Sequence, residues 1–393
     1  MPEPLHLSVA LSDAGWHPGA WRAPNARPDE LFTGRYWADL VGEAESAALD
    51  FVTIDDGLGL QRDHLLTPDE RTDRVRGRLD SALIANRVAP TRRAIGLIPT
   101  AIVTHTEPFH TAKTIATLDY VGHGGAGVTL RVDASAADAR LFGRRSLPDL
   151  APGDLDPAII DSLFTEAADY AEVLRRLWDS WEDDAEIRDG ATGRFIDRDK
   201  LHYIDFAGKY FSVRGPSITP RPPQGQPPIA MLGHDSAVNE LIGRSADIGF
   251  ITPRAASDIV SITSEINSAR AKFVGDDERV RVFVDLAVIL GATDEQAARR
   301  ASRLDELAGA QFVSDAEIFV GTPVGLADRI EEFATADIAG FRLRPAVLPD
   351  DLHSITRELV PELRRRKRFR DGYTATTLRG HLGLGRPANR YAA

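Results

Sequence analysis

The chain has 393 residues, 43% of them hydrophobic and 27% charged, which are ordinary proportions for a folded globular protein. Its 47 basic and 59 acidic residues give a formal net charge of −12, which disfavours nucleic acids as partners because their phosphates repel an acidic protein. The absence of cysteine excludes disulfides and thiolate chemistry, and the absence of a long apolar run predicts no membrane partner.

Short apolar segments of strand length recur along the chain, each flanked by Gly, Pro, Asp or Arg. We predict strands over residues 5–10, 50–54, 94–99, 126–132, 228–232, 247–251, 280–289 and 338–343. Helical periodicity alternates with them, and predicts helices over residues 35–48, 78–88, 109–121, 157–180, 236–244, 255–273, 294–306 and 323–336. Because parallel strands need crossover connections, eight such units predict a single (β/α)8 TIM-barrel domain over residues 1–393.

Two insertions are too long to be ordinary connections. Residues 11–35 follow the first strand, at the end of a barrel where active sites form, and are predicted to be a functional loop. Residues 181–227 lie between the fourth helix and the fifth strand. Within them, residues 206–213 predict a small hairpin that carries the insertion back across the barrel. The tail, residues 368–393, has little periodicity and is predicted to wrap the barrel or a partner subunit.

The N-terminus begins Met1-Pro2-Glu3-Pro4 and carries no basic or apolar segment of signal-peptide length, so we expect a cytoplasmic protein. One basic cluster, residues 364–370, stands out from the acidic composition. It is compatible with an anion-binding patch. Apolar residues precede it at helical spacing, however, and we interpret it as cations at the C-terminus of a helix.

Several motifs occur in a fixed order along nearly the whole chain. They are His17-Pro-Gly-Ala-Trp-Arg22, Ile95-Gly-Leu97 with Thr100, Glu107-Pro-Phe-His110, Leu177-Trp-Asp-Ser-Trp-Glu-Asp-Asp184, Phe211-Ser-Val-Arg-Gly-Pro216, Pro223-Gln-Gly-Gln-Pro227, Pro361-Glu-Leu363 and Thr377-Leu-Arg-Gly-His-Leu-Gly-Leu384. With these motifs the chain resembles the nitrilotriacetate monooxygenase branch of the bacterial-luciferase-like, flavin-dependent monooxygenases.

The resemblance implies an enzyme that uses reduced FMN as a co-substrate, supplied by a separate flavin reductase. It implies activation of O2 and insertion of one oxygen atom into a small organic substrate, with a protein that orients the flavin and excludes water. It also implies a homodimer or homotetramer. Because substrates of the branch range from aminopolycarboxylates to alkanes, the resemblance indicates a reaction type and not a substrate.

Two polar residues match family positions near the flavin ring. Asp56 ends the second strand and is predicted to bind the flavin; the alternative is a carboxylate that orders a loop or caps a helix. Thr100 ends the third strand, and its hydroxyl is predicted to bond the ring; the alternative is a β-branched residue that ends a strand.

Two histidines are candidate catalytic residues. His17 lies on the first long loop, where contact with a substrate is expected, and His110 begins a helix, where it is a candidate proton donor or a packing residue. Trp16, Trp21 and Trp37 cluster by the first loop and are expected to form an apolar wall or ordinary packing. No set of His, Asp and Glu has metal-ligand spacing, and we predict no metal.

The turn Gly233-His234-Asp235-Ser236 corresponds to the family's phosphate site at the start of a helix. Gly233 matches the family pattern, but Asp235 replaces a serine, and a carboxylate repels a phosphate while being an excellent N-cap. Further departures lie in the fourth βα unit, where Gly125, Thr129 and Val132 replace Arg, Asn and Thr, and where Leu163 and Phe164 replace Arg and Tyr.

These departures leave two further hypotheses open. One is a barrel of the same descent that has lost the flavin and acts as a partner or binding subunit, which Asp235, Phe164 and Val132 favour. The other is an oxidoreductase that uses the deazaflavin F420, which the nitrilotriacetate-type motifs favour less than FMN.

Overall fold

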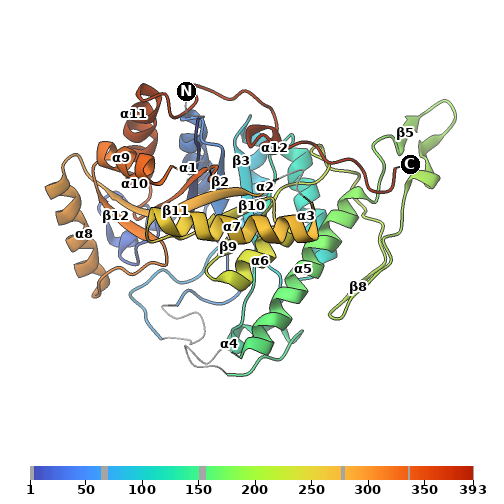
Figure 1. The fold of residues 1–393 in the computed structure, drawn as a ribbon, viewed down its shortest axis with the longest axis horizontal. Helices are drawn as coiled ribbons and strands as arrows, with labels where there is room; N and C mark the ends of the chain where they lie inside the picture. The colour runs from blue at the N-terminus through green and yellow to red at the C-terminus, as the bar shows by residue number, and fades with distance from the viewer. Residues whose placement is uncertain (1–3, 63–69, 150–155, 276–278, 335–336, 393) are drawn as a thin grey trace.

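The structure, a computed structural model, describes residues 4–62, 70–149, 156–275, 279–334 and 337–392. Eight parallel strands form a closed barrel (Figure 1). In barrel order they are β1 (His6–Leu11), β2 (Phe51–Ile54), β3 (Gly96–Ile102), β4 (Val128–Arg131), β9 (Ile229–Gly233), β10 (Ile248–Ile251), β11 (Arg281–Leu290) and β13 (Gly340–Pro345). The pairing of β13 with β1 closes the ring, so the predicted (β/α)8 fold class is confirmed.

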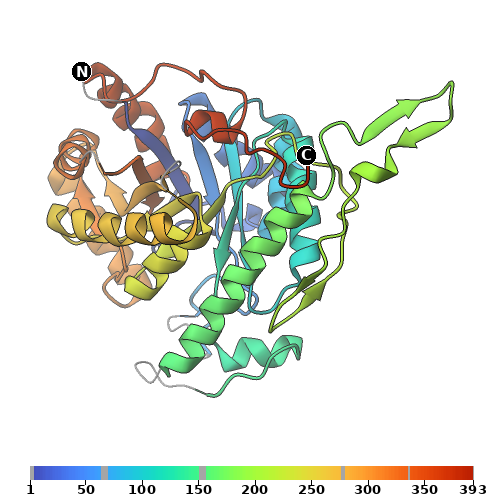
Figure 2. The ribbon, with the colours of Figure 1, turned by 45° about the vertical axis from the view of Figure 1, so that its right-hand side comes forward.

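Helices connect the strands and cover the outside of the barrel (Figures 1 and 2). The predicted helices correspond to α1 (Gly34–Ser46), α2 (Ser81–Val88), α3 (Pro108–Val121), α5 (Pro157–Asp179), α6 (Ser236–Ser245), α7 (Ala256–Phe273), α8 (Asp294–Ala308) and α9 (Pro323–Phe333). Residues 335–336, predicted to end the last helix, lie outside the described residues. Further helical segments are α4 (Ala136–Phe142), α10 (Asp350–Ser354), α11 (Val360–Arg365) and the short α12 (Leu378–His381).

Helix α1 illustrates why these segments fold as they do. Its Thr33 side chain caps the helix by accepting a hydrogen bond from the Tyr36 backbone N–H. Tyr36, Leu40 and Val41 recur at helical spacing and are buried against the barrel. The strands, in contrast, are buried on both faces, as expected for a parallel sheet enclosed by helices.

One additional strand, β12 (Glu317–Gly321), pairs with the second half of β11 outside the barrel. It was not predicted, because its apolar run, Ile318-Phe319-Val320, is only three residues long and the strand is half-exposed.

The tail closes the amino-terminal end of the barrel. Leu378 of α12 and Leu382, which directly follows it, belong to one hydrophobic cluster with Phe51, Ile98 and Phe283 inside the barrel. In Figure 2, α12 lies at one end of the barrel, whereas α4 and the start of α5 lie at the other. The end at which the strands finish, called the mouth below, is therefore the end open to a ligand.

The insertion before β9 has two parts. The antiparallel pair β5 (Glu186–Asp189) and β6 (Arg194–Ile196) projects away from the barrel (Figure 2). The predicted hairpin is present as β7 (Phe206–Ala207) and β8 (Ser212–Val213), which pair antiparallel. Its Tyr210 hydroxyl lies 2.9 Å from Ser162 Oγ near the start of α5, so this part of the insertion folds back toward the mouth.

The basic cluster at residues 364–370 is engaged in ion pairs. Arg365 and Arg366 both pair with Glu362, and Arg370 pairs with the buried Asp50. This arrangement agrees with cations at the end of a helix rather than with an open anion patch. Within the described ranges, no helix combines the length and the apolar character needed to cross a membrane.

Candidate active site

A buried histidine holds the loop after β1. His17 Nδ1 accepts a hydrogen bond from the Gly19 backbone N–H at 3.0 Å, and His17 Nε2 lies 3.1 Å from Asp305 Oδ1 on α8. These contacts fit a neutral ring with its proton on Nε2. Burial lowers the pKa of His17, which favours the same neutral form. The structure thus places His17 where it fixes the loop to α8.

His110, the other predicted catalytic histidine, lies exposed in the first turn of α3. Its ring centroid is 6.4 Å from that of Phe109. In the part of the chain that the structure describes, His110 and His17 share no partner, so the fold does not assemble them into one catalytic pair.

A third histidine, His105, was not singled out by any motif. It lies in the turn after β3, is buried, and stacks on Phe142 of α4 with ring centroids 5.6 Å apart. Its Nε2 is 3.9 Å from Asp133 Oδ2, and neither ring nitrogen has a hydrogen-bond partner among the described residues. Burial lowers the pKa of His105. Its position directly after a barrel strand is the sequence signal that could have identified it.

Asp56 and Thr100 are linked through one serine. Asp56 accepts hydrogen bonds from the backbone N–H groups of Gly57 at 2.7 Å and Ser81 at 2.8 Å. The Ser81 hydroxyl in turn donates to the Thr100 carbonyl at 3.1 Å. Burial raises the pKa of Asp56. Asp56 therefore orders the loop before α2, as its alternative interpretation predicted, and flavin contact stays a prediction.

Thr129 has an unused polar group at the mouth. It is the partner of Thr100 across β3 and β4, and of Ala230, which belongs to the barrel interior, across β4 and β9. Thr129 is buried, yet its Oγ1 has no hydrogen-bond partner within the described ranges. Leaving a buried hydroxyl unpaired costs about 1–3 kcal/mol, so this atom is suited to bond a ligand.

Ion pairs occupy one side of the mouth. Asp55 Oδ2 lies 2.9 Å from Arg78 and Asp55 Oδ1 lies 3.1 Å from Arg131. Asp13 from the first loop lies 3.5 Å from Arg78, and burial raises its pKa. These contacts join the loops after β1 and β2 to the end of β4.

A second network lies on the other side, on β11 and β13. Asp285, fully buried, pairs with Arg342 and Arg344 at 2.5 Å each. Arg344 also pairs with Asp315 at 2.5 Å, and its guanidinium lies 4.9 Å from the centroid of the Trp16 ring. No sequence motif predicted these networks.

The predicted phosphate turn has the geometry of a capped helix. The Asp235 side chain accepts a hydrogen bond from the Val238 backbone N–H at 3.0 Å and caps α6. Gly233 ends β9, and a Cβ atom there would lie 2.6 Å from Asn239 Oδ1, so a larger residue would require the Asn239 side chain to move. Ser236 begins α6, and His234 is half-exposed, with Nδ1 3.7 Å from Asp315. A carboxylate thus caps the helix start where the sequence resemblance predicts a serine.

Two of the other residues that differ from the family pattern, Phe164 and Val132, are apolar. Phe164 on α5 and Val132 after β4 are partly buried and pack against the hydrophobic core. Phe164 therefore presents no hydroxyl at the position where the sequence resemblance predicts a tyrosine.

A cavity of about 150 Å3 lies beside the first loop. Trp16, His17, Trp21, Arg62 and Arg74 are among its lining residues. Two of the three predicted tryptophans therefore line a cavity, whereas the buried Trp37 donates its indole N–H to the Leu31 carbonyl inside the core.

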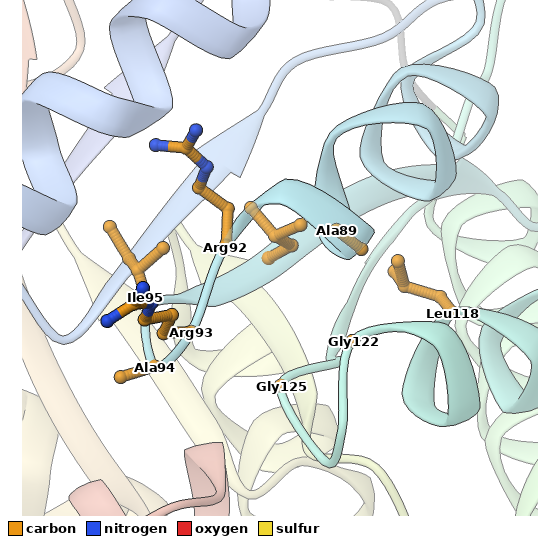
Figure 3. Close-up of a pocket in the computed structure, with 9 residues that line it drawn as sticks. Ala89, Arg92, Arg93, Ala94, Ile95, Leu118, Gly122 and Gly125 are labelled. Atoms are coloured by element: carbon orange, nitrogen blue, oxygen red, sulfur yellow. The ribbon is translucent and has the colours of Figure 1, made fainter.

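The small hollow in Figure 3 lies at the opposite end of the barrel, between the end of α3 and the start of β3. Its volume of about 10 Å3 is too small for more than a water molecule. Among the described residues, no three His, Asp or Glu side chains are grouped to hold a metal ion.

These observations test whether a flavin fits. The mouth offers the unpaired Thr129 hydroxyl, a group suited to a carbonyl or nitrogen of a flavin ring. The start of α6 does not fit a phosphate well, because the Asp235 carboxylate already accepts from one first-turn donor, the Val238 backbone N–H, and would repel a dianion. The ring end of a flavin therefore fits, and the predicted phosphate position does not.

Residues 14–336 match the family described as luciferase-like monooxygenase. The chain is 29% identical to N-acetyl-S-(2-succino)cysteine monooxygenase of Bacillus subtilis, over 99% of this chain and 98% of the relative. It is 28% identical to nitrilotriacetate monooxygenase component A of Aminobacter aminovorans, with the same coverage.

Among solved structures, a riboflavin lyase with modified FMN and riboflavin shares this fold, with a TM-score of 0.83 and 24% identity over 99% of this chain and 98% of the other. The sequence resemblance is thereby confirmed: the chain belongs to the luciferase-like monooxygenase family, a family of oxidoreductases.

Proposed function

We propose that this chain is a monooxygenase that depends on reduced FMN, receives it from a separate reductase, and inserts one oxygen atom of O2 into a small organic substrate. The observation that carries the proposal is the buried Thr129 hydroxyl, unpaired within the described chain, at the mouth of a barrel from a monooxygenase family. The designation of the Aminobacter relative as component A supports a two-component system. When bound, reduced flavin supplies the activation of O2.

The residues of the mouth have distinct tasks in this proposal. Thr129 donates its hydroxyl to the flavin ring, whereas the Thr100 hydroxyl already donates to the Ile54 carbonyl and offers the ring only an acceptor. Asp56, acting through Ser81, keeps Thr100 in place. The first loop, fixed by His17, covers the site with Trp16 and excludes water from the reacting oxygen. His110 lies at the same end of the barrel, because α3 begins there, and its exposed ring is the predicted proton donor.

One observation favours a second candidate function. The Asp235 carboxylate at the start of α6 disfavours a phosphate there, and a barrel that binds no flavin would act as a partner or binding subunit. The two candidates differ in a single measurable property, which is flavin affinity.

Flavin titration tests the proposal. We expect oxidised FMN fluorescence to be quenched by the purified chain, and reduced FMN to bind under anaerobic conditions. With a flavin reductase, NADH and O2, we expect a product whose mass exceeds that of the substrate by one oxygen atom. Absence of FMN binding at high micromolar concentration would contradict the proposal and favour the partner-subunit function. Binding of F420 in place of FMN, titrated in parallel, would identify the deazaflavin alternative.

A further inference from the structure

The loop after β1 is attached by its backbone to the segment that ends β13. The Trp16 backbone N–H donates to the Pro345 carbonyl at 2.9 Å, and the His17 backbone N–H donates to the Ala346 carbonyl at 3.0 Å. Gly15 has a φ of +131°, and a Cβ atom there would lie 2.2 Å from the Ala346 carbonyl oxygen, so the two segments approach too closely for a side chain. The backbone of Trp16 is therefore held in one place at the mouth.

The indole ring of Trp16 is held as well. Its N–H donates to the Ala10 carbonyl of β1 at 2.7 Å. The Arg344 guanidinium lies 4.9 Å from the ring centroid, which is the distance of a cation–π contact. Arg344 is itself fixed by ion pairs with Asp285 and Asp315, and its side chain is only 3% exposed. The protein thus orients the ring through contacts that require no ligand.

Trp16 lines the cavity of about 150 Å3 beside the first loop. Trp21, Pro18 and Val75 contribute further apolar groups to the lining. A cavity of about this volume accommodates one ring of the size of benzene, and it is too small for the three fused rings of a flavin. The cavity therefore suits a separate, small ligand with a single ring.

The charged groups of the lining are already paired. Arg62 forms an ion pair with Asp138 at 2.6 Å. Asp13 accepts a hydrogen bond from Gln61 Nε2 at 3.2 Å and lies 3.5 Å from Arg78. Because these two charges have partners of opposite sign, the feature by which the cavity can select a ligand is the ring rather than a full charge.

We propose that Trp16, positioned by Arg344, is a stacking platform for one planar ring, and that the substrate is a small monocyclic aromatic or heteroaromatic compound. Aromatic rings attract each other beyond the burial of their area, and a side chain that is ordered beforehand loses little conformational entropy on binding. Arg344 is a positioning residue, since it acts through Trp16. The inference rests on the proposed function, because it names the substrate class of the same site.

Ligand-observed NMR titration of the full chain, without flavin, tests the inference with three probes. Phenol is planar, cyclohexanol has the same size and the same hydroxyl on a puckered ring, and 2-naphthol has two fused rings. We expect phenol to bind about threefold to tenfold more tightly than cyclohexanol. We expect 2-naphthol to bind more weakly than phenol, although it is more apolar, because the cavity holds one ring.

Three results would overturn the inference. They are equal affinities for phenol and cyclohexanol, no binding of phenol at millimolar concentration, and tighter binding of 2-naphthol than of phenol.

Two variants place the phenol at Trp16. Trp16→Leu keeps an apolar side chain but removes the ring, and should abolish the preference for phenol over cyclohexanol. Arg344→Lys keeps the positive charge beside its carboxylate partners but removes the planar guanidinium, and should reduce the preference at least about twofold. Arg329→Lys is the matched control, because Arg329 lies 4.0 Å from the ring centroid of Phe333 and neither residue lines the cavity. A preference that Trp16→Leu leaves unchanged contradicts the proposal.

Circular dichroism and thermal unfolding check that each variant folds. If Arg344→Lys does not fold, Trp16→Leu decides the question, and if neither folds, the three affinities of the wild type decide it. The probes need no flavin, so this test is independent of the flavin titration. Loss of the phenol preference with intact FMN binding overturns this inference alone, whereas absence of FMN binding overturns the proposed function.

Discussion

Thr100 and Thr129 lie opposite each other on β3 and β4, but their hydroxyl groups have different surroundings. Thr100 Oγ1 donates a hydrogen bond to the Ile54 carbonyl at 2.9 Å, whereas Thr129 Oγ1 has no partner among the described residues. Two adjacent threonines at the barrel mouth therefore differ in what they can offer a ligand, and this difference can be measured.

Thr129→Val should leave stability unchanged within about 1 kcal/mol, because no hydrogen bond of the folded chain is lost. If the hydroxyl bonds the flavin ring, the same change should weaken FMN and riboflavin alike by about five- to tenfold, since a hydrogen bond contributes about 1 kcal/mol. Urea unfolding and flavin titration provide the two readouts. Thr100→Val is the control: it removes an internal hydrogen bond and should lower stability by about 1 kcal/mol.

His105→Phe should raise stability by about 1 kcal/mol, because it removes two unpaired buried nitrogens and retains a ring to stack on Phe142. The substitution should also change how stability depends on pH in the acidic range. Burial lowers the pKa of His105, so its contribution to stability is present above pH 6.5 and is lost as the pH falls through the folded-state pKa. The variant should lose less stability on acidification than the wild type.

His17→Phe is the matched control. It removes the hydrogen bonds to Gly19 and Asp305 and should lower stability by about 2 kcal/mol. Equal changes in the free energy of unfolding for His17→Phe and His105→Phe would contradict the claim that only His17 has hydrogen-bond partners.

Asp133→Asn should weaken the pH dependence of stability between about pH 4 and pH 6. Burial, together with the neighbouring Asp138 carboxyl, raises the pKa of Asp133 to about 6. The folded state therefore holds the proton more tightly than the unfolded state, and stability declines as the pH rises from about 4 through about 6. The asparagine side chain can still accept the hydrogen bond from the Ser135 backbone N–H.

Over that range the wild type should lose stability relative to Asp133→Asn by about 1–2 kcal/mol. The free energy of unfolding, measured at several pH values, is the readout. Parallel profiles for the two proteins would mean that Asp133 titrates at its ordinary pKa.

Asp285→Asn should be the most destabilising of these changes, by about 3–5 kcal/mol, because it leaves two buried guanidinium groups with one fewer counter-charge. Calorimetry or urea unfolding would measure the loss. Glu317→Gln alters a partly exposed pair with Arg329 and should cost less than about 1 kcal/mol. A loss of less than about 1 kcal/mol for Asp285→Asn would show that the ion pairs of Asp285 with Arg342 and Arg344 contribute little to stability.

The strands and helices of the barrel could be predicted because their signals are local. Periodicity places Tyr36, Leu40 and Val41 on one face of α1, and apolar runs of a few residues mark the barrel strands. Local signals do not reach β12, which is half-exposed, or α4, which has only 7 residues. The motif order was sufficient to identify the family, because it samples the whole chain.

The candidate site could be predicted only in part. Thr129 and Asp235 were identified from the resemblance to the family, and the capping role of Asp235 is what its residue type predicts. No sequence motif predicted the proximity of His105 to Asp133. Nor did any motif predict the ion pairs of Arg344 with Asp315 and Asp285.

The sequence alone determined that this chain forms a barrel of eight βα units and carries the motifs of one flavoenzyme family, because hydrophobic period and residue order are properties of the chain itself. Only the tertiary structure decided which polar groups at the mouth are paired and which are unused. Barrel closure brings β13 beside β1 and places Arg344 over Trp16, residues far apart along the chain. Side-chain partners across such distances depend on how the strands close, and no local pattern encodes them.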